Sequence, residues 1–410
     1  QPPDGNHLEE SGGDGGMILS DVCEFIVDCP HSTAPDEGEG YPLIRTPNVG
    51  KGRLDLNGVH RVSESVYKQR IQRGAPRAND LIFAREAPAG NVALVQENQT
   101  VCLGQRTVLI RPNVQKVNPQ YLVYYLLSPE PQYELLGTAN GATVAHVNLP
   151  AIRNLKIELP EKSVQDKIGT ILVTYDDLIE NNQRQIKLLE EAAQRLYKEW
   201  FVDLRFPGYE NTKIVDGVPE GWQWCKVRDV ADINSSALPK NYKEDFIDYV
   251  DLGSVRCGHI ETRTRYNLNE APGRAKRCAK DGDIIWGMVR PNLKAYALVT
   301  NPKETDVFST GFAVLSAKKV PYSYLYCAVT QEEFVGYLVN ATNDAAYPAV
   351  KPIHFEKADI LKPDDKILEQ FHGVADSIFG KIEALENQNH NLSEARDLLL
   401  PKLMRGEVEV

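Results

Sequence analysis

The chain has 410 residues, of which 42% are hydrophobic and 25% are charged, and its formal net charge is −11. These proportions are typical of a folded globular protein and exclude a disordered chain. No apolar run approaches the roughly 20 residues that a membrane-spanning helix requires. We therefore expect a soluble protein of two or three domains that makes no contact with a membrane.

The cysteine pattern argues against disulfides and metal sites. Seven cysteines occur, an odd number, and none forms a Cys-x-x-Cys pair. Cys23 and Cys29 could supply half of a metal site, but no His or Cys lies near enough in sequence to complete it. We expect free thiols in a reducing cytoplasm, with no metal and no cofactor. Residues 1–16, rich in Gly and acids, are interpreted as a tag or a disordered tail.

The most informative feature is an internal repeat. Residues 80–83 (Asp-Leu-Ile-Phe) match residues 283–286 (Asp-Ile-Ile-Trp), and Pro88 matches Pro291; 291 minus 88 is 203. The same offset relates other paired residues along almost the whole chain. A period of this length is too long for a solenoid repeat and fits a whole domain with an appended helix. The sequence therefore predicts two similar halves within one chain.

Each half has the same order of predicted elements. Alternating apolar residues predict strands at 81–85, 92–95 and 107–110, and again at 284–288, 295–299 and 312–315. A helix follows at 121–127 or 322–329, and Asn118 with Pro119 would cap the first of these. A further strand ends at Pro160 or Pro363, where a long helix with acidic first residues begins.

The two long helices each carry a heptad seam. Apolar residues recur at alternating steps of four and three from Ile168 to Trp200, and again from Phe371 to Leu403 with Arg396 as one charged exception. This pattern predicts an antiparallel coiled coil of roughly 60 Å. One Asn lies in each seam, Asn182 and Asn389. Either they face each other and fix the register, or both lie at the edge of the seam in water.

Together these patterns predict an α+β fold with two pseudo-symmetric globular domains separated by two long antiparallel coiled-coil helices. The predicted domains are residues 17–160 and 221–363. The predicted helices are residues 161–203 and 364–410, and residues 204–220 form a linker.

The net charge argues at first against nucleic-acid binding, because affinity for DNA comes largely from neutralising phosphates. The acidic surplus, however, lies in the tail, the helices and the linker, and both globular segments are close to neutral. Residues 45–85 contain nine basic and three acidic residues, and residues 256–294 contain nine basic and four acidic residues. One basic cluster in each half is what a bipartite DNA contact needs.

Candidate DNA-binding residues are the clustered basic residues together with polar residues in loops beside the strands, because Arg, Asn and Gln distinguish bases in the major groove. Any one of them could instead contact a phosphate or stabilise its own loop. In the first half they are Arg45, Lys51, Arg53, Arg77, Arg85, Asn91, Gln105, Arg106, Thr143, His146 and Asn148. In the second half they are Arg256, Arg263, Arg265, Arg274, Arg277, Arg290, Asn292, Lys294, Tyr296, Tyr347 and Lys351.

Motifs of catalysis are missing from the sequence. We find no phosphate-binding loop, dinucleotide fingerprint, HExxH or G-x-S-x-G, and no Asn/Asp-Pro-Pro-aromatic motif of an adenine methyltransferase. Residues 364–366 (Asp-Asp-Lys) fit half of a nuclease motif, but no Pro-Asp pair lies suitably upstream and helix capping explains the aspartates. The sequence predicts no active site.

Three segments carry a family resemblance. Residues 196–203 (Leu-Tyr-Lys-Glu-Trp-Phe-Val-Asp), followed by Pro-Glu-Gly-Trp at 219–222, resemble the junction after the first central helix in specificity subunits of type I restriction-modification enzymes. Residues 397–407 are similar to the carboxyl terminus of that family, and the strands 80–83 and 283–286 are similar to those of its target-recognition domains. The resemblance extends from Met17 to the end of the chain.

The resemblance implies a non-catalytic subunit that binds double-stranded DNA. Each of two target-recognition domains, 17–160 and 221–363, would read half of an asymmetric split site. Two modification (methyltransferase) subunits would grip the central helices and restriction subunits would join them, so methyl donor and nucleotide would be bound by the partners. One alternative is a coiled-coil scaffold whose globular ends bind proteins; another is a self-contained modification or cleavage enzyme, which the missing motifs disfavour.

Overall fold

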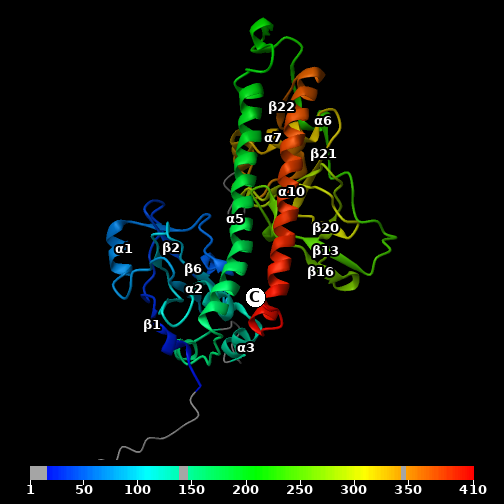
Figure 1. Ribbon diagram of the computed structural model, residues 1–410. Coiled ribbons are helices and arrows are strands. Elements are labelled where there is room, and N and C mark those ends of the chain that lie inside the picture. The colour runs from blue at the N-terminus through cyan, green and yellow to red at the C-terminus, as the bar shows by residue number, and fades with distance from the viewer. Residues whose placement is uncertain (1–15, 138–145, 343–347) are drawn as a thin grey trace, which may run out of the picture. The chain divides into compact units, whose positions relative to one another are not determined.

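The computed structural model describes residues 16–137, 146–342 and 348–410 (Figure 1). The chain divides into two compact units, which we call unit 1 (residues 1–181 and 388–410) and unit 2 (residues 182–387). Each unit therefore contains one part of each long helix, α5 (Lys162–Tyr197) and α10 (Asp365–Met404). None of the helices in the described ranges combines the length and the apolar character that crossing a bilayer takes.

Unit 1 is built on a five-stranded sheet with the strand order β1-β8-β5-β6-β3, accompanied by a three-stranded sheet with the order β4-β2-β7. Buried apolar residues of β5, β6 and β8 pack against those of α2, and together they form the main core of the unit. The strands are β1 (Cys23–Asp28), β2 (Tyr41–Ile44), β3 (Gly52–Arg53), β4 (Arg61–Val62), β5 (Leu81–Ala84), β6 (Val92–Leu94), β7 (Cys102–Leu103) and β8 (Thr107–Pro112), and the helices are α1 (Glu64–Arg70), α2 (Pro119–Leu127), α3 (Pro129–Gly137) and α4 (Leu149–Arg153).

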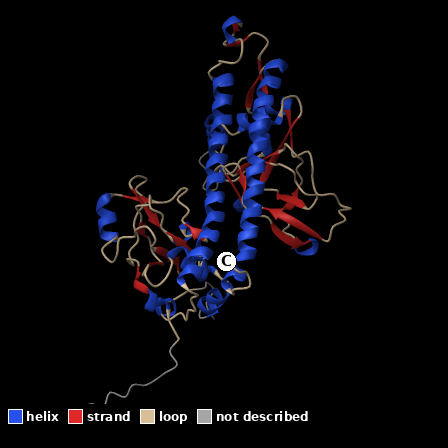
Figure 2. Ribbon diagram, in the orientation of Figure 1, coloured by secondary structure: helices blue, strands red, loops and turns tan. Residues whose placement is uncertain are grey.

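Unit 2 has a four-stranded sheet with the order β12-β21-β18-β19 and a second one with the order β16-β13-β20-β17. Figure 2 shows the strands in red and the helices in blue. The pairs β11-β22, β14-β15 and β9-β10 complete it. The strands are β9 (Ile214–Val215), β10 (Val218–Pro219), β11 (Gln223–Lys226), β12 (Ala231–Ile233), β13 (Phe246–Val250), β14 (Val255–Arg256), β15 (His259–Ile260), β16 (Thr264–Asn267), β17 (Ala275–Arg277), β18 (Ile284–Gly287), β19 (Tyr296–Leu298), β20 (Asp306–Ser309), β21 (Phe312–Ala317) and β22 (Asp359–Lys362), and the helices are α6 (Val227–Val230), α7 (Tyr322–Val329), α8 (Glu332–Asn340) and α9 (Pro352–Lys357).

The two units repeat one topology. The order β1-β8-β5-β6 in unit 1 corresponds to β12-β21-β18-β19 in unit 2. The helices α7, α8, α9 and α10 begin 203 residues after α2, α3, α4 and α5, as in 322 minus 119 and 365 minus 162. The α+β class and the duplication predicted from the sequence are confirmed. The units differ most in the second sheet, which has three strands in unit 1 and four in unit 2.

The helix boundaries follow from local chemistry. The side chain of Asn118 accepts the backbone N–H of Tyr121 at 3.0 Å, and Pro119 is the first residue of α2, so the predicted cap is confirmed. Asp364 accepts the N–H of Ile367 at 3.0 Å at the start of α10. α5 continues into five residues of π-helix, η3 (Lys198–Val202).

One predicted strand is wrong. The segment that ends at Pro363 forms β22 paired with β11, but the segment that ends at Pro160 forms only an isolated bridge between Lys156 and Ile18. In unit 2 the equivalent pair Lys226–Asp359 is the first of four that continue to Gln223–Lys362, whereas the described part of unit 1 has only its bridge, which includes the hydrogen bond from the Ile157 N–H to the Met17 carbonyl.

The long helices run antiparallel within each unit taken by itself. In unit 1 the guanidinium of Arg396 donates to the Asp176 carboxylate, and the Lys167 ammonium donates to the carbonyl of Val410 at 3.0 Å. In unit 2 the rings of Trp200 and Phe371 lie 5.9 Å apart. They belong to a hydrophobic cluster that also contains other apolar residues of the two helices. Residue numbers thus rise along α5 as they fall along α10.

The charged exception at Arg396 is part of a buried polar group. The Arg396 side chain is 14% exposed, and that of its ion-pair partner Asp176 is 3% exposed. Tyr124 of α2 donates its hydroxyl to the same Asp176 carboxylate at 2.5 Å. Burial of the hydroxyl, and next the negative charge of Asp176, raises the pKa of Tyr124 far above its usual value. The phenol therefore remains a hydrogen-bond donor. Asn182 is buried and Asn389 half-buried; their pairing stays a prediction.

The first prediction tests this polar group. Because a buried charge that loses its partner is strongly destabilising, Asp176→Asn and Arg396→Gln should each lower the free energy of unfolding of unit 1 by about 3–5 kcal/mol. The double variant should lose at least about 2 kcal/mol less than the sum of the single losses, as expected for directly coupled residues. Denaturant unfolding of the three variants measures this coupling, and strictly additive losses would contradict it.

The second prediction uses the repeat as its own control. Asp80 and Asp283, each 1–2% exposed, accept the backbone N–H of Arg77 and Lys280 at 3.0 and 2.9 Å. Asp80 also forms two hydrogen bonds with Arg111, at 2.8 and 2.7 Å, whereas Asp283 has no ion pair among the described residues. Burial raises the pKa of Asp283 above its ordinary 3.8, although hydrogen bonds from Lys280 and Ser316 oppose this.

Asp80→Asn should therefore destabilise unit 1 by about 3–5 kcal/mol, because Arg111 loses its buried counter-ion. Asp283→Asn should leave unit 2 unchanged or stabilise it at pH 7. A carboxyl with a raised folded-state pKa contributes stability below its unfolded pKa and loses it as the pH rises through the folded value, so the charged form is a cost at neutral pH. Hydrogen exchange resolved by unit measures both effects; equal losses in the two units would refute the assignment.

Candidate nucleic-acid interface

In unit 1, three loops meet at the end of β5. The N–H of Arg85 donates to the carbonyl of Arg106 at 2.9 Å, and the N–H of Val147 donates to the carbonyl of Arg85 at 3.0 Å. These bonds join residues 85–91, 104–106 and 146–148, which we call loop cluster 1. Loops that a sheet holds in place are where binding residues commonly lie.

Unit 2 has the same arrangement at the end of β18. The N–H of Met288 donates to the carbonyl of Gly311 at 2.8 Å, and the N–H of Val350 donates to the carbonyl of Met288 at 2.8 Å. These bonds join residues 288–294, 309–311 and 348–351, which we call loop cluster 2. Met288 and Val350 stand 203 residues after Arg85 and Val147. The backbone bonds of the two clusters are therefore equivalent, whereas the side chains differ.

Arg85 holds loop cluster 1 together. It donates to the Asp28 carboxylate at 2.7 Å and to the Val147 carbonyl at 2.8 Å, and it lies 2.9 Å from Nε2 of His146. The side chains of Arg85 and Asp28 are 12% and 14% exposed. An arginine with its nitrogens engaged in this way positions the loops; its predicted contact with DNA stays a prediction.

The outer part of loop cluster 1 presents Arg106. This residue has a positive φ of 64°, and its side chain is 62% exposed while it pairs with Glu86 at 2.8 Å. Glu86 also accepts a hydrogen bond from His146. Gln105 donates to the carbonyl of His31 at 3.0 Å. The structure thus brings four predicted residues together: Arg85, Gln105, Arg106 and His146.

Loop cluster 2 presents a different set of groups. Arg290 and Lys294 flank the 3₁₀ turn η7 (Pro291–Leu293) with positive φ values of 50° and 53°. The N–H of Arg290 donates to the carbonyl of Pro348 at 2.8 Å, which brings Lys351 close in the same cluster. Arg290, Asn292 and Lys351 are exposed, and Lys294 is paired with Glu332 of α8.

Several predicted residues of unit 1 stabilise their own surroundings. Asn91 donates to the carbonyl of Val49 at 2.9 Å, and Asn148 caps α4 by accepting the N–H of Ala151 at 2.8 Å. Arg77 forms an exposed ion pair with Glu24 at 3.2 Å. These contacts show a loop-stabilising role and leave DNA contact by the same residues untested.

Arg45 follows β2 and packs against Gly104 of loop cluster 1, whereas Lys51 and Arg53 lie next to and within β3. Arg53 pairs with Asp177 of α5, and the Nε atoms of Arg45 and Arg53 are buried without a hydrogen bond in the described structure. Lys51 is exposed and forms no ion pair with any described residue.

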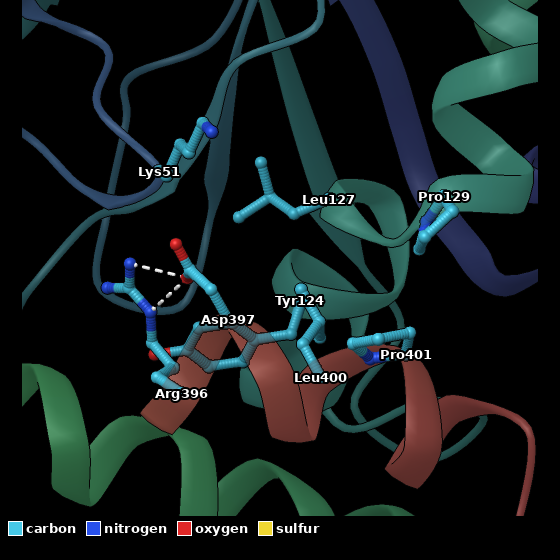
Figure 3. Close-up of a pocket in the computed structure, with 8 residues that line it drawn as sticks. All are labelled: Lys51, Tyr124, Leu127, Pro129, Arg396, Asp397, Leu400 and Pro401. Atoms are coloured by element: carbon cyan, nitrogen blue, oxygen red, sulfur yellow. Dashed lines mark hydrogen bonds and ion pairs between the residues drawn. The ribbon is translucent and has the colours of Figure 1, made fainter. Parts of the chain in front are cut away.

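Lys51 lines a small cavity of about 220 Å³ in unit 1 (Figure 3). Tyr124, Leu127 and Leu400 contribute apolar surface, and Arg396 and Asp397 lie at its edge with a hydrogen bond of 2.8 Å between them. The cavity is smaller than the roughly 300–1,000 Å³ of typical ligand sites. We assign no cofactor to it.

In unit 2, Arg265 lies on β16, an edge strand of the second sheet, and Arg263 directly precedes that strand. Arg265 donates to both oxygens of Asp248, at 2.9 and 3.1 Å, and its guanidinium stacks 4.0 Å from the ring centre of Phe246. This hydrogen bonding holds the pKa of Asp248 below its usual range. Arg263 pairs with Asp306 at 3.3 Å. The Arg265 side chain is still 63% exposed, so the edge remains open on one side.

The remaining predicted residues of unit 2 are spread out. Arg274 is exposed and its side chain contacts no partner in the described ranges, while Arg256 lies 3.7 Å from Glu261. Arg277 on β17 is half-buried, with Nε lacking a hydrogen bond among the described groups. Tyr296 is a packing residue, because its ring lies 5.6 Å from that of Trp286. Thr143 and Tyr347 lie outside the described residues.

The carboxylates that engage the basic residues were not found from the sequence. Asp28, Glu86, Asp248 and Asp306 each accept an arginine, so much of the positive charge counted in the two clusters is already neutralised. Most of the pairs join residues distant in sequence, which no local spacing reveals. One signal was present: Asp248 interrupts the otherwise apolar strand β13.

The fold and the repeated loop clusters define a class of two-unit α+β proteins with a pair of long helices. The chain is similar to the crystal structure of the type I restriction-modification system S subunit from M. genitalium, with a TM-score of 0.53 and 15% sequence identity. The match covers 97% of this chain and 98% of that one. At this identity the likeness shows the fold alone.

Sequence comparisons define the family. Residues 17–191 match the type I restriction modification DNA specificity domain. The chain is 27% identical over 367 residues to the type I restriction enzyme MjaIX specificity subunit of Methanocaldococcus jannaschii, covering 86% of this chain and 83% of that protein. It is 22% identical over 404 residues to the HindI specificity subunit of Haemophilus influenzae, covering 82% and 87%. The resemblance to type I specificity subunits is confirmed, and residues 17–191 belong to this domain family.

The third prediction concerns exposed basic residues without a partner. Lys51→Ala and Arg274→Ala should each weaken binding to random-sequence duplex DNA, and each should reduce the slope of log affinity against log salt by about 1, because one phosphate contact is lost. Fluorescence anisotropy at several salt concentrations measures the slope. Lys318→Ala, which removes an ammonium paired with Asp232 at 2.8 Å, is the control and should leave the slope unchanged. Wild-type slopes in both variants would remove these residues from the interface.

Proposed function

We propose that this chain is the sequence-specific DNA-binding subunit of a type I restriction-modification complex. Residues 17–160 and 221–363 would be its two target-recognition domains, each reading half of an asymmetric split site in double-stranded DNA. The observation that carries this proposal is the repetition of one loop scaffold with different side chains. Equivalent backbone hydrogen bonds hold the loops together within each cluster, but loop cluster 1 has Arg85 at the position where loop cluster 2 has Met288.

The chemistry of the two clusters supports two different half-sites. Loop cluster 1 offers Arg106, Gln105 and His146, whereas loop cluster 2 offers Arg290, Asn292 and Lys351. Arginine pairs with guanine and asparagine or glutamine with adenine in the major groove, so the two sets should select different bases. Arg263, directly before β16, and Arg265 on this strand are better suited to phosphate contacts, because their carboxylate partners already fix their orientation.

We propose further that two modification subunits hold the central helices and that restriction subunits join this assembly. The chain itself would be non-catalytic, so methyl donor and nucleotide would be bound by the partner subunits. Cytoplasmic DNA is the substrate that this arrangement serves. The alternative, a coiled-coil scaffold that binds proteins through its globular ends, predicts DNA binding that does not depend on sequence or salt.

The fourth prediction separates the two half-sites. The chain is purified with the modification subunits of its operon, and methyl transfer from labelled S-adenosylmethionine to DNA is mapped by sequencing. Arg106→Ala should relax base preference within one half-site, and Asn292→Ala within the other, each by about 1–3 kcal/mol of discrimination. Each variant is thus the control for the other.

The chain without modification subunits should transfer no methyl group. Sequence-independent methylation by the wild-type complex would overturn the proposal. So would a change at both half-sites from either single variant, since each loop cluster would then fail to act on its own half.

A further inference from the structure

The hairpin β14-β15 of unit 2 connects loop cluster 2 to the long helices. At its turn, the N–H of Cys257 donates to the carbonyl of Lys294 at 3.0 Å, and the N–H of Gly258 donates to the carbonyl of Tyr296 at 2.8 Å. Lys294 is the last residue of the loop that carries Arg290 and Asn292. A shift of the hairpin turn therefore acts directly on the backbone of that loop.

The other side of the hairpin is bound to both long helices through one side chain. Nδ1 of His259 lies 2.7 Å from Oε1 of Glu386 on α10, and Nε2 lies 3.2 Å from Oε1 of Glu190 on α5. Both ring nitrogens can donate only when the imidazole is protonated. The two hydrogen bonds raise the pKa of His259 to about 10, with Glu190 as the larger contribution, so the ring carries its charge at neutral pH.

Among the described residues, the charged groups that act on His259 are Glu190 and Glu386 from the helices. Tyr326 from α7, Tyr296 from β19 and Cys257 from the turn also lie near, and Arg256, opposite His259 in the hairpin, is 73% exposed and lies 3.7 Å from Glu261. Burial raises the pKa of both tyrosines, which keeps them neutral. Without the imidazolium, two glutamates from different helices would face the same space with no positive group between them.

Gly258 shows how closely the hairpin lies on α5. Its φ is +101°, and a Cβ at this position would lie 2.9 Å from Oε1 of Glu190 and 3.2 Å from the hydroxyl of Tyr326. The backbone conformation favours a glycine here, because L side chains rarely adopt this φ. The hairpin turn thus lies against the side chains of Glu190 and Tyr326, in addition to the contacts that His259 makes.

We propose that His259 is a positioning residue that fixes the hairpin, and with it loop cluster 2, to both long helices at once. Because its two partners come from α5 and α10, a change in the register or separation of these helix segments displaces the loop that carries Arg290 and Asn292. A partner subunit that grips the helices would thereby set the geometry of base reading in unit 2. The consequence for DNA rests on the proposed function, whereas the link between hairpin and helices does not.

In the described part of unit 1 the link is arranged differently: Asp176 of α5 receives Arg396 of α10 and Tyr124 of α2, and no side chain of a hairpin beside the recognition loops binds both long helices. There, Arg53 of β3 pairs with Asp177 on α5, and the position equivalent to His259 is Leu56. The side chain that joins the helices in unit 1, Arg396, belongs to α10 itself. The inference therefore predicts coupling between helices and recognition loops that is stronger in unit 2.

Hydrogen exchange of the full-length chain tests the link. His259→Gln should increase exchange of the amides of Cys257 and Gly258 by about tenfold or more, because hydrogen bonds to charged groups are lost. The double variant Glu190→Gln/Glu386→Gln should increase exchange of these amides to a similar extent. In the triple variant, which also carries His259→Gln, their exchange rate should be no more than about twofold above that of the single or the double variant, as expected for residues that act as one unit. His31→Gln, which alters an exposed histidine of unit 1, is the matched control. Unchanged exchange at 257 and 258 would overturn the inference.

A titration of the wild-type chain tests the charge of His259 directly, with the Glu386→Gln chain for comparison. The imidazole of His259, followed by NMR, should stay protonated through pH 8, and its apparent pKa should fall in Glu386→Gln. Stability from a raised histidine pKa is fully present below the unfolded value of 6.5 and is lost as the pH rises towards 10, so the hairpin amides should exchange faster only in alkaline solution, beyond the intrinsic increase. An ordinary pKa near 6.5 would refute the double ion pair.

Methylation by the complex with modification subunits tests the consequence. His259→Gln should relax base preference only at the half-site that Asn292→Ala affects, and Glu386→Gln should act at the same half-site. Increased exchange with both half-sites intact would overturn the positioning role while leaving the link. Sequence-independent methylation by the wild-type complex would instead count against the proposed function, and the exchange result would be unaffected by it.

Discussion

Carboxylates on the two long helices are paired with cationic side chains in both units, in a buried site in unit 1 and in a partly exposed one in unit 2. In unit 1, Asp176 receives both Arg396 and the hydroxyl of Tyr124, so one carboxylate joins α5, α10 and the globular part. In unit 2, His259 has the corresponding place between Glu190 and Glu386. An ion pair of this kind adds little net stability compared with an apolar contact, but it penalises every arrangement that separates the partners. Its main physical effect is therefore to select one register.

The two units share the same backbone scaffold but carry different side chains at equivalent positions. The buried aspartate before the central strand accepts the same backbone N–H in both units, yet Asp80 has Arg111 as a counter-ion and Asp283 does not. The loop clusters show the same division, because equivalent main-chain bonds hold loops with different side chains. A scaffold fixed by main-chain bonds tolerates changes at exposed positions, since those changes remove no bond that holds the loop.

Much of the fold could be predicted from the sequence because periodicity and capping are local. The bounds of α7 agree with the predicted helix, and Asn118 caps α2 as expected. The missing strand before Pro160 depended on pairing with a segment about 140 residues away in sequence, which a local pattern does not state. Arg396 stood out as an exception to the seam, but its partner Asp176 could be identified only after the register of the helices was known.

The candidate site was less predictable for a related reason. Sequence counts basic residues but does not show which are neutralised: Arg85 is engaged by Asp28 and Arg265 by Asp248, whereas Lys51 and Arg274 carry unmatched charge in the described structure. The second sheet of unit 2 was also missed, because β16 and β17 are short, polar edge strands with no apolar alternation. Pairing across long sequence distances decides both features.

The assignment of residues 388–410 to unit 1 has a consequence for how the chain is made. A ribosome releases residues 182–387 as one continuous stretch, so unit 2 can close its core while synthesis continues. Unit 1 has to wait, because Asp176 meets Arg396, and the core around Leu172 receives Leu403, only when the last residues emerge. The half of the protein that is translated first is thus the half that finishes folding last, and until then it exposes the apolar surface that chaperones bind.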